Sequence, residues 1–225
     1  MRVVIAGGHG KIALQLSGLL ARRGDAVVGL IRNPDHADDV AATGAEAVVF
    51  DLESGRATTL AEHLEGVDAV VFAAGAGPGS GIPRKDTVDR AGAALLAEAA
   101  ELRGVRRYLL ISSMGFDLDD PDWAPPPGTG DVFRAYLRAK AAAELDLRAR
   151  YLDWTVLRPG ALTDEDPSGT VRLAPPKVDR GEISRADVAA VSLALLDEPR
   201  SAGLTLEAVG GDTPIVDAVR AVVTR

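Results

Sequence analysis

The chain has 225 residues and no cysteine, 47% of its residues are hydrophobic, and its formal net charge is −8. This size fits one α/β domain over residues 1–225 with a full core, and the acidic balance argues against nucleic-acid binding. The lack of cysteine excludes disulfides, thiolate metal sites and cysteine nucleophiles, and no apolar run approaches the ~18 residues needed to cross a bilayer.

The first predicted strand, Val3–Ala6, is apolar and rich in β-branched residues, which is typical of a strand buried on both faces. Because Met1 leads directly into this strand, there is no room for a signal peptide, and we expect a cytoplasmic protein. The strand runs into Gly7-Gly8-His9-Gly10, after which helical spacing begins at Ile12. Strand, glycine turn and helix together form the context in which backbone N–H groups hold a pyrophosphate.

The glycine turn has the spacing of a dinucleotide site. Gly7, Gly10 and Ala13 match the pattern G-x-x-G-x-x-A, whose small last residue lets the helix lie close to its strand. The residues predicted to hold the cofactor phosphates are Gly7, Gly8, His9, Gly10, Lys11 and Ile12. His9 is alternatively a tolerated loop residue, and the three histidines are too scattered in the sequence to predict a metal site.

The second predicted strand, Ala26–Ile31, ends at a residue that bears on cofactor choice. The residue after this strand contacts the adenosine ribose in nucleotide-binding α/β folds, where an acid favours NAD(H) and an arginine accommodates the 2′-phosphate of NADP(H). Arg32 stands there with no acid before it, which favours NADP(H) and leaves NAD(H) as the alternative. Arg32 is otherwise a solvated side chain. Asn33 then predicts a helix N-cap, with Pro34 as the first helical residue.

Two further strands are predicted at 47–50 and 67–72, with a helix at 57–64 between them. Asp51 and Leu52 follow the earlier strand and are expected to hold the adenine by a polar contact and an apolar wall. Small residues follow the later one, where they let a cofactor ribose lie against the backbone: Ala73, Ala74 and Gly75. The glycine-rich loop continues to Gly81 and is of the kind that closes over a bound group. All of these residues are also compatible with ordinary turn chemistry.

The middle of the chain predicts a long helix over 85–102 that ends at Gly104, and a fifth strand over 107–111. Segment 117–130 is acidic and rich in Pro and Gly, which indicates a surface loop beside the site. Asp131 is expected to cap the next helix, which runs to about Arg150.

The last third predicts a sixth strand over 152–157, stopped by Arg158-Pro159-Gly160, and an irregular substrate region over 161–183 with short strands near 170–173. A helix over 184–196, a strand over 204–208 and a helix over 214–223 complete the chain. The alternation of strands and helices predicts an α/β, Rossmann-type doubly wound fold, with a mostly parallel sheet and helices on both faces.

Tyr136 and Lys140 form the most distinctive chemical pair. Four residues apart on a helix, they lie on one face about one turn apart. An ammonium beside a phenol favours the phenolate, so that the tyrosine can exchange a proton with a substrate hydroxyl or carbonyl. The spacing also occurs by chance, and Lys140 is equally placed to pair with Glu144 on an exposed stripe.

These features together resemble the short-chain dehydrogenases/reductases, specifically the compact atypical branch described as NAD(P)-binding, NmrA-like or epimerase/dehydratase-like. The matching segments are 7–13, 31–34, 51–52, 70–75, 111–115, Tyr136 with Lys140, 153–160 and 183–189. The resemblance implies that Tyr136 is the catalytic acid/base, that Lys140 binds the nicotinamide ribose and tunes Tyr136, and that Ser113 hydrogen-bonds the substrate. It also implies cofactor contact by Pro159.

Several departures from the family pattern bear on the reaction. Ser113 lies 23 residues before Tyr136, a longer gap than in compact dehydrogenases, and Ser112 is the alternative substrate contact. Asp89 stands where many relatives carry Asn, which puts the usual water relay in doubt. Arg158 is expected either to neutralise an anionic group in the crevice or to pair with nearby carboxylates. Arg185-Ala186-Asp187 predicts a helix start with a buried Asp–Arg contact.

The sequence thus predicts an NAD(P)-dependent oxidoreductase or epimerase that acts on a small carbonyl or hydroxyl compound, as a monomer or homodimer with no nucleic-acid or membrane partner. Two alternatives are a non-catalytic NADP(H)-binding redox sensor and a flavin-type reductase that needs no tyrosine acid. Retention of both Tyr136 and Lys140 argues against the sensor, which needs neither residue.

Overall fold

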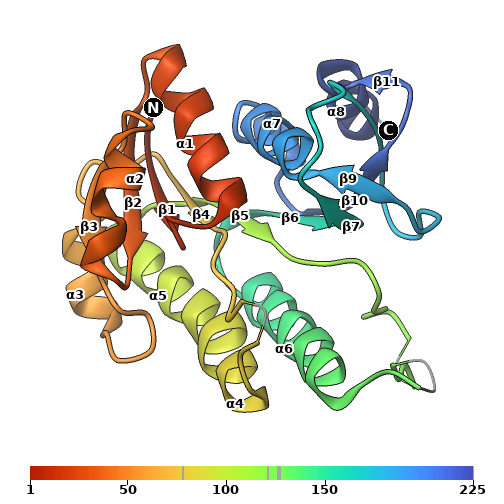
Figure 1. Ribbon diagram of the computed structural model, residues 1–225, viewed down its shortest axis with the longest axis horizontal. Helices are drawn as coiled ribbons and strands as arrows, with labels where there is room; N and C mark the ends of the chain where they lie inside the picture. Colours follow the sequence, from red (N-terminus) through yellow and green to blue (C-terminus); the bar gives the residue numbers. More distant parts are fainter. Residues whose placement is uncertain (78, 121, 126–127, 225) are drawn as a thin grey trace.

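A nine-stranded sheet forms the centre of the computed structural model, which describes residues 1–77, 79–120, 122–125 and 128–224 (Figure 1). Its strand order is β11-β8-β10-β6-β5-β4-β1-β2-β3, and a separate two-stranded sheet pairs β7 with β9. The strands are β1 (Arg2–Ala6), β2 (Ala26–Ile31), β3 (Glu46–Val49), β4 (Ala69–Phe72), β5 (Arg107–Ile111), β6 (Asp153–Pro159), β7 (Ala161–Thr163), β8 (Thr170–Ala174), β9 (Glu182–Ser184), β10 (Leu204–Gly210) and β11 (Thr213–Pro214).

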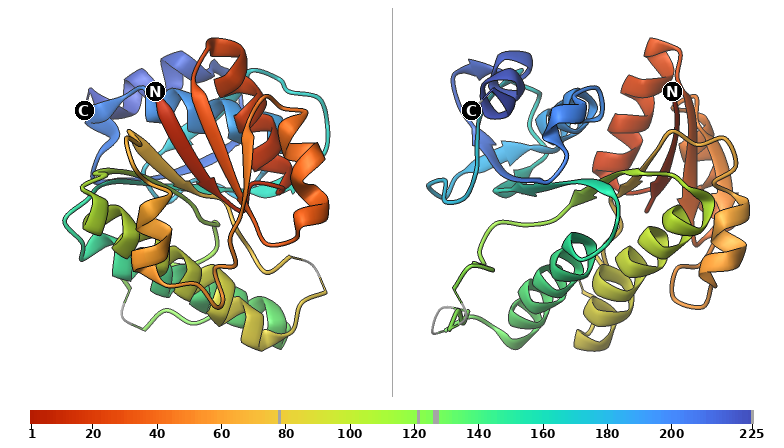
Figure 2. Two further views of the ribbon diagram at one scale, coloured as in Figure 1. Left: turned by 90° about the vertical axis from the view of Figure 1, so that its left-hand side faces the viewer. Right: turned by 180° about the vertical axis from the view of Figure 1, so that it is seen from behind.

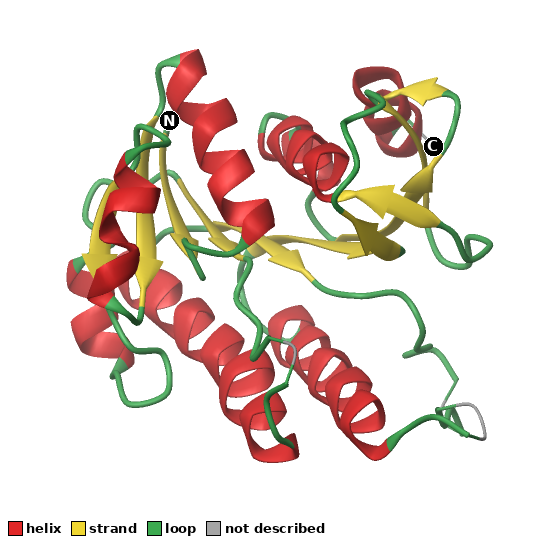
Figure 3. Ribbon diagram, viewed as in Figure 1, coloured by secondary structure: helices red, strands yellow, loops and turns green. Residues whose placement is uncertain are grey.

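Helices cover both faces of the sheet (Figures 2 and 3). One face packs against α1, α2, α7 and α8, and the other against α3, α5 and α6, with a separate apolar core on each side. The helices are α1 (Lys11–Arg23), η1 (Pro34–His36), α2 (Ala37–Ala41), α3 (Ala57–Glu62), α4 (Ile82–Arg84), η2 (Lys85–Gly92), α5 (Ala93–Arg103), α6 (Asp131–Arg148), α7 (Arg185–Leu196), η3 (Pro199–Ser201) and α8 (Ile215–Val223). This confirms the predicted Rossmann-type α/β fold.

The strand order explains where a ligand binds. β1 pairs in parallel with β2 on one side and with β4 on the other, so the chain changes direction across the sheet at β1. In open α/β sheets, the crevice at the carboxyl ends of the strands beside such a point binds the ligand. The loops after β1, β2, β3 and β4 carry most of the predicted cofactor residues, and they meet at that edge.

The predicted long helix over 85–102 is interrupted in the structure. Lys85–Gly92 is π-helical and α5 starts only at Ala93. A π-helical turn widens the helix locally and often occurs at functional sites, and here it carries Lys85 and Asp89. The helix ends at Gly104 in the left-handed conformation, as expected.

Three expectations about the second half of the chain were wrong in detail. Asp131 is the first residue of α6 rather than its cap, and Gly130 occupies the N-cap without a side-chain hydrogen bond. Segment 161–183 is not irregular, because it forms β7, β8 and most of β9, and β8 joins the main sheet antiparallel to β10. β6 also continues through Arg158 to Pro159 instead of stopping before them, because its ladder with β10 extends that far.

Parts of two predicted loops lie outside the described residues, namely Pro78 in the glycine-rich loop and Pro121, Pro126 and Pro127 in segment 117–130. Among the residues that the structure describes, no helix is long and apolar enough to cross a membrane.

Candidate functional site

The turn between β1 and α1 leaves no room for side chains. Gly7 has a φ of +82°, and a Cβ there would lie 2.5 Å from the Cα of Ala74, so only glycine fits. Gly10 precedes the first helical residue and provides no side-chain cap. The first amides of α1 therefore have no partner within the helix and are available to an anion. Gly8 serves packing instead, since a Cβ there would lie 2.7 Å from the Cα of Gly29.

A first cavity of about 410 Å³ opens at this turn. Its walls come from the loops after four parallel strands, as the topology requires. The lining residues are Gly7, His9, Gly10, Leu30–Asn33, His36, Phe50–Glu53, Ala73–Gly77, Arg84 and Val88. Most of the predicted cofactor residues are among them, including Arg32, Asp51, Leu52 and Gly75. Lys11 is not: its Nζ lies 2.5 Å from the carboxylate of Asp164.

His9 takes part in an aromatic stack at the mouth of this cavity. Its ring lies 3.6 Å from that of His36, centroid to centroid, and its Nε2 is 2.8 Å from Asp39 Oδ2. The stack joins the glycine turn to the segment after β2. His9 thus lies at the predicted place, with an intramolecular partner.

Arg32 lies in the first cavity and is held by a carboxylate that the sequence did not single out. Its Nη1 donates to Glu53 Oε2 at 3.0 Å. The same oxygen accepts from Arg84 Nη2 at 2.8 Å, and Oε1 accepts from Thr87 Oγ1 at 2.6 Å. The hydrogen bonds from Arg84 and Thr87 are the main reason why the pKa of Glu53 is lowered from its usual value. The rim of the cavity therefore carries two guanidinium groups bridged by one carboxylate.

A second cavity of about 910 Å³ adjoins the first, and the two share Gly10 and residues 73–77. It reaches from the glycine turn to the N-terminal half of α6 and has a largely apolar wall. The lining residues are Gly10, Ile12, Ala73–Gly77, Lys85, Asp89, Ile111, Ser112, Gly130–Phe133, Tyr136, Lys140, Pro159, Leu162 and Arg185. The structure thus brings Tyr136, Lys140, Ile12 and Pro159 together, as expected.

Tyr136 has two ammonium groups near its ring in the second cavity. Lys140 Nζ is 5.7 Å from the centroid of its ring and Lys85 Nζ is 5.6 Å from it. The side chain of Phe133 stacks on Tyr136 at a centroid distance of 5.8 Å. Lys85 donates to the carbonyl of Gly77 at 3.0 Å and has no carboxylate partner among the described residues.

Lys140 is buried and has a buried counter-charge. Its Nζ lies 3.3 Å from Asp89 Oδ1 and donates to the Ile111 carbonyl at 3.3 Å. The other oxygen of Asp89 accepts from the amide of Ala76 at 3.1 Å. The alternative pairing of Lys140 with Glu144 does not occur, because Glu144 is engaged by Arg158.

The structure places Ser112 in the second cavity, whereas Ser113 is not among its lining residues. The amides of Ser112 and Met114 donate to Leu157 and Pro159 on β6, so the extended pattern of β5 continues and consecutive side chains alternate. Ser113 instead donates to the carbonyl of Met114 at 3.0 Å. The buried Ser112 hydroxyl has no hydrogen-bond partner within the described part of the chain, so of the two serines it is the one free to contact a ligand.

Of the two roles that the sequence allowed for Arg158, the structure shows the pairing with nearby carboxylates. Its Nη2 and Nε donate to the two oxygens of Glu144 at 2.7 and 2.9 Å, and its guanidinium lies 4.3 Å from the centroid of Phe116. Glu207 Oε1 lies 3.7 Å from Arg158 Nη1. All the charged groups of this cluster are buried, which leaves no free charge for a ligand.

The expected Asp–Arg contact at the start of α7 does not form. Asp187 instead accepts hydrogen bonds from the amides of Ser168 and Gly169 and from the Ser184 hydroxyl. Arg185 donates instead to Asp164 at 2.8 Å. Ser184, which we predicted to be the first helical residue, is thus the N-cap of α7.

Sequence reasoning missed Glu53, Arg84 and Lys85 as site residues. Each belongs to a loop or helix start that long-range folding brings to the cavity, so no local spacing identifies it. Lys85 had one available signal, since it stands four residues before Asp89 and so on the same helical side. Within the described ranges, no group of three or more His, Asp or Glu side chains gathers in a way that would hold a metal ion.

Comparison with known proteins places this site in a family. Residues 7–199 match the family model described as NAD(P)H-binding. The chain is 34% identical to the "Uncharacterized sugar epimerase YhfK" of Bacillus subtilis over 98% of its own length and 99% of that protein. Among solved structures, a Bacillus halodurans protein, whose name proposes an NAD-dependent epimerase/dehydratase, superposes with a TM-score of 0.87. It is 35% identical, and the match covers 99% of this chain and 100% of that one.

A second solved structure, the oxidoreductase ylbE of Lactococcus lactis, superposes with a TM-score of 0.86 at 28% identity, covering 100% of this chain and 98% of that one. Both structural matches span essentially the whole chain. The chain therefore belongs to the NAD(P)H-binding family of atypical short-chain dehydrogenases/reductases.

Proposed function

We propose that the protein is an NADP(H)-dependent oxidoreductase or epimerase that acts on a small carbonyl or hydroxyl compound, with Tyr136 as the acid/base. The observation that carries this proposal is the position of Tyr136 and Lys140 on the wall of a cavity continuous with the glycine-turn cavity. A sensor would need the first cavity alone. The names of the Bacillus and Lactococcus relatives support the same class of reaction.

The residues of the first cavity fit a dinucleotide. The backbone of Gly7 approaches that of Ala74 so closely that no side chain fits, and the free amides at the start of α1 suit a pyrophosphate. Asp51 and Leu52 line the cavity where the adenine is expected, and Arg32 stands at its rim. Lys140 and Pro159 would then hold the nicotinamide half. When bound, the cofactor supplies or accepts the hydride.

Tyr136 is placed to exchange the proton that balances this transfer. In reduction, its hydroxyl donates to the substrate oxygen and the phenolate that forms lies beside two ammonium groups, Lys85 and Lys140. Because the cavity wall is largely apolar, these charges act in a medium of low polarity, where they stabilise an anion more than in water. Asp89 offsets the charge of Lys140, so Lys85 carries the uncompensated charge.

The substrate faces a broad apolar wall. Val132, Phe133 and Leu162 line the second cavity, and the side chain of Phe133 is 54% exposed. Ser112 is the polar group available for hydrogen bonding at the inner end. This combination favours a compound with an apolar body and one reacting oxygen over a highly hydroxylated one.

A reaction with NADPH deuterated at C4 tests the proposal, with a panel of aldehydes, ketones and quinones as acceptors. We expect deuterium transfer to at least one acceptor, and the Tyr136→Phe variant should lower kcat by about 10²–10⁴-fold while it binds NADPH as the wild type does. Tyr151→Phe is the matched control, because Tyr151 is 84% exposed and lines neither cavity. Unchanged turnover in Tyr136→Phe would remove the tyrosine from the mechanism and favour the flavin-type reductase; NADPH binding without turnover across the panel would favour the sensor.

A further inference from the structure

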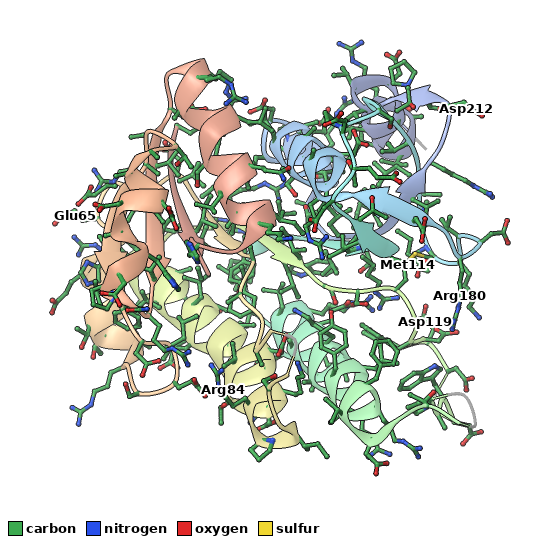
Figure 4. All side chains as sticks on the ribbon, in the orientation of Figure 1. Glu65, Arg84, Met114, Asp119, Arg180 and Asp212 are labelled. Carbon is green, nitrogen blue, oxygen red and sulfur yellow. The ribbon has the colours of Figure 1, made fainter. Side chains whose placement is uncertain are left out.

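The rim of the first cavity contains a charge cluster formed by Arg32, Glu53, Arg84 and Thr87. Arg32 follows β2, Glu53 follows β3, and Arg84 and Thr87 belong to α4 and η2. Glu53 holds the cluster together, since each of its oxygens accepts from at least one of the three other residues. Figure 4 shows Arg84 at the α4 end of the molecule.

The cluster lies where a nucleotide would place its adenosine ribose. Arg32, Glu53 and Arg84 line one cavity with Asp51 and the glycine turn. Both guanidinium groups bind the same oxygen, Glu53 Oε2, at 3.0 and 2.8 Å. Two arginines that converge on one anionic oxygen form the kind of site that also binds a phosphate oxygen.

From this geometry we infer that Arg84 is a second ligand of the cofactor 2′-phosphate and that Glu53 competes with this phosphate for the two arginines. The inference rests on the proposed NADP(H) preference. In the free protein, the Glu53 carboxylate neutralises one of the two positive charges. A 2′-phosphate that binds there must take over the arginine hydrogen bonds next to a like charge. Glu53 therefore sets the margin by which the protein prefers NADP(H) over NAD(H).

The low pKa of Glu53 agrees with this assignment. Hydrogen bonds from Arg84 and Thr87 lower it, so the carboxylate is charged at neutral pH. The competition is consequently electrostatic and should weaken as salt screens it.

Calorimetric titration with 2′,5′-ADP and with 5′-AMP tests the inference, because the two ligands differ by the 2′-phosphate and neither reaches the second cavity. We expect Glu53→Gln to bind 2′,5′-ADP about tenfold more tightly than the wild type and 5′-AMP within about twofold. Arg84→Met should weaken 2′,5′-ADP about tenfold and leave 5′-AMP unchanged. The gain in Glu53→Gln should shrink between low and high salt.

Glu65→Gln is the matched control, because Glu65 also pairs with an arginine, Arg103, at 2.8 Å, and it lies at the outer edge of the molecule, away from Arg84 (Figure 4). This variant should bind both ligands as the wild type does. If Glu53→Gln binds 5′-AMP less tightly and 2′,5′-ADP as tightly as the wild type does, Glu53 accepts from the ribose hydroxyl and the inference is overturned. Equal losses for both ligands would give Glu53 a structural role only and would likewise overturn the inference.

These outcomes remain separate from a failure of the proposed function. Wild-type protein that binds neither NADPH nor NADH would refute the proposed function itself. If the wild-type protein binds NADPH and the Glu53→Gln variant shows the same preference between 2′,5′-ADP and 5′-AMP as the wild type, only the role of Glu53 is refuted.

Discussion

Lys140 Nζ lies 3.3 Å from Asp89 Oδ1, and the side chains of both residues are buried. The lysine that the family resemblance assigns to the nicotinamide ribose thus has its own carboxylate in the protein interior. The pair links α6 to the π-helical segment η2, and Asp89 also holds the loop after β4 through the amide of Ala76. Stability and site geometry therefore depend on the same carboxylate.

Removal of Asp89 should destabilise the protein strongly. Asp89→Ala leaves the buried Lys140 ammonium without a counter-charge, and we expect a loss of about 3–5 kcal/mol in the free energy of unfolding. The double variant Asp89→Ala/Lys140→Met removes both charges and should recover much of that loss. Urea denaturation checks this, with Lys177→Met as the control. The Lys177–Asp117 pair lies at the surface and should contribute little, and equal losses in all three variants would contradict a charge-based explanation.

Substitution of Lys85 should slow the reaction and leave the adenosine half of the cofactor bound as before. Lys85 lines only the second cavity, and its ammonium lies 5.6 Å from the Tyr136 ring centroid. We expect Lys85→Met to lower kcat by about 10–100-fold, with unchanged affinity for 2′,5′-ADP. Lys85→Arg keeps the charge and should recover part of the rate. Steady-state kinetics with the acceptor found in the deuterium assay measures the effect; a variant that changes KM alone would show that Lys85 acts in binding only.

Arg158 should matter for stability and not for ligand binding. Arg158→Met removes the guanidinium nearest to the buried carboxylates of Glu144 and Glu207 and leaves Glu144 only Arg148, at 3.7 Å, so we expect a loss of about 3–5 kcal/mol. Arg158→Met combined with Glu144→Leu should be clearly more stable than the single variant, because an apolar pair then replaces Arg158 and its nearest carboxylate, and only Glu207 stays without its partner. Thermal unfolding gives the stabilities and calorimetry the NADPH affinity. A selective loss of ligand affinity would restore the anion-binding alternative.

The stabilisation that Asp187 provides should be lost in acid. Burial alone raises the pKa of Asp187, but hydrogen bonds from Ser168, Gly169 and Ser184 outweigh it, so the folded-state pKa lies below the usual 3.8. A carboxyl whose pKa falls on folding contributes its full stabilisation above the unfolded value, and that contribution disappears as the pH falls through the folded value.

Asp187→Asn should therefore cost about 1–3 kcal/mol at pH 7 and progressively less below about pH 4. Urea denaturation at a series of pH values measures the difference between the two proteins. The cost should shrink with acidification, and a constant difference would show that the hydrogen bonds do not depend on the charge of Asp187.

The fold was readable from local patterns, because a parallel sheet buried on both faces produces uninterrupted apolar strands such as Val3–Ala6. The glycine turn could also be predicted, because the spacing of its glycines is set within a few residues of the chain. The antiparallel addition of β8 was not, because its pairing with β10 depends on contacts between distant segments. The π-helical segment was likewise hidden, since its extra residue per turn is stabilised by packing and not by composition.

The site shows the same division. Tyr136 and Lys140 were predicted together because helical spacing fixes their relative position. Helical spacing also made Glu144 a plausible partner of Lys140, yet Arg158 from β6 takes Glu144 and Asp89 takes Lys140. A buried charged side chain can pair with a group on any element that packs against it, and a single sequence does not show which group that is. The pairing of Arg32 with Glu53 across two loops was unpredictable for this reason too.

Asp164 binds both Lys11, at the start of α1, and Arg185, at the start of α7. One carboxylate thus joins the glycine-turn helix to the helix that follows β9. A phosphate that attracts Lys11 would leave Asp164 to Arg185 alone, and Arg185 lines the second cavity. If a bound phosphate drew Lys11 away from Asp164, occupancy of the two cavities would be thermodynamically linked, and by reciprocity a dinucleotide and a substrate would change each other's affinity by the same factor.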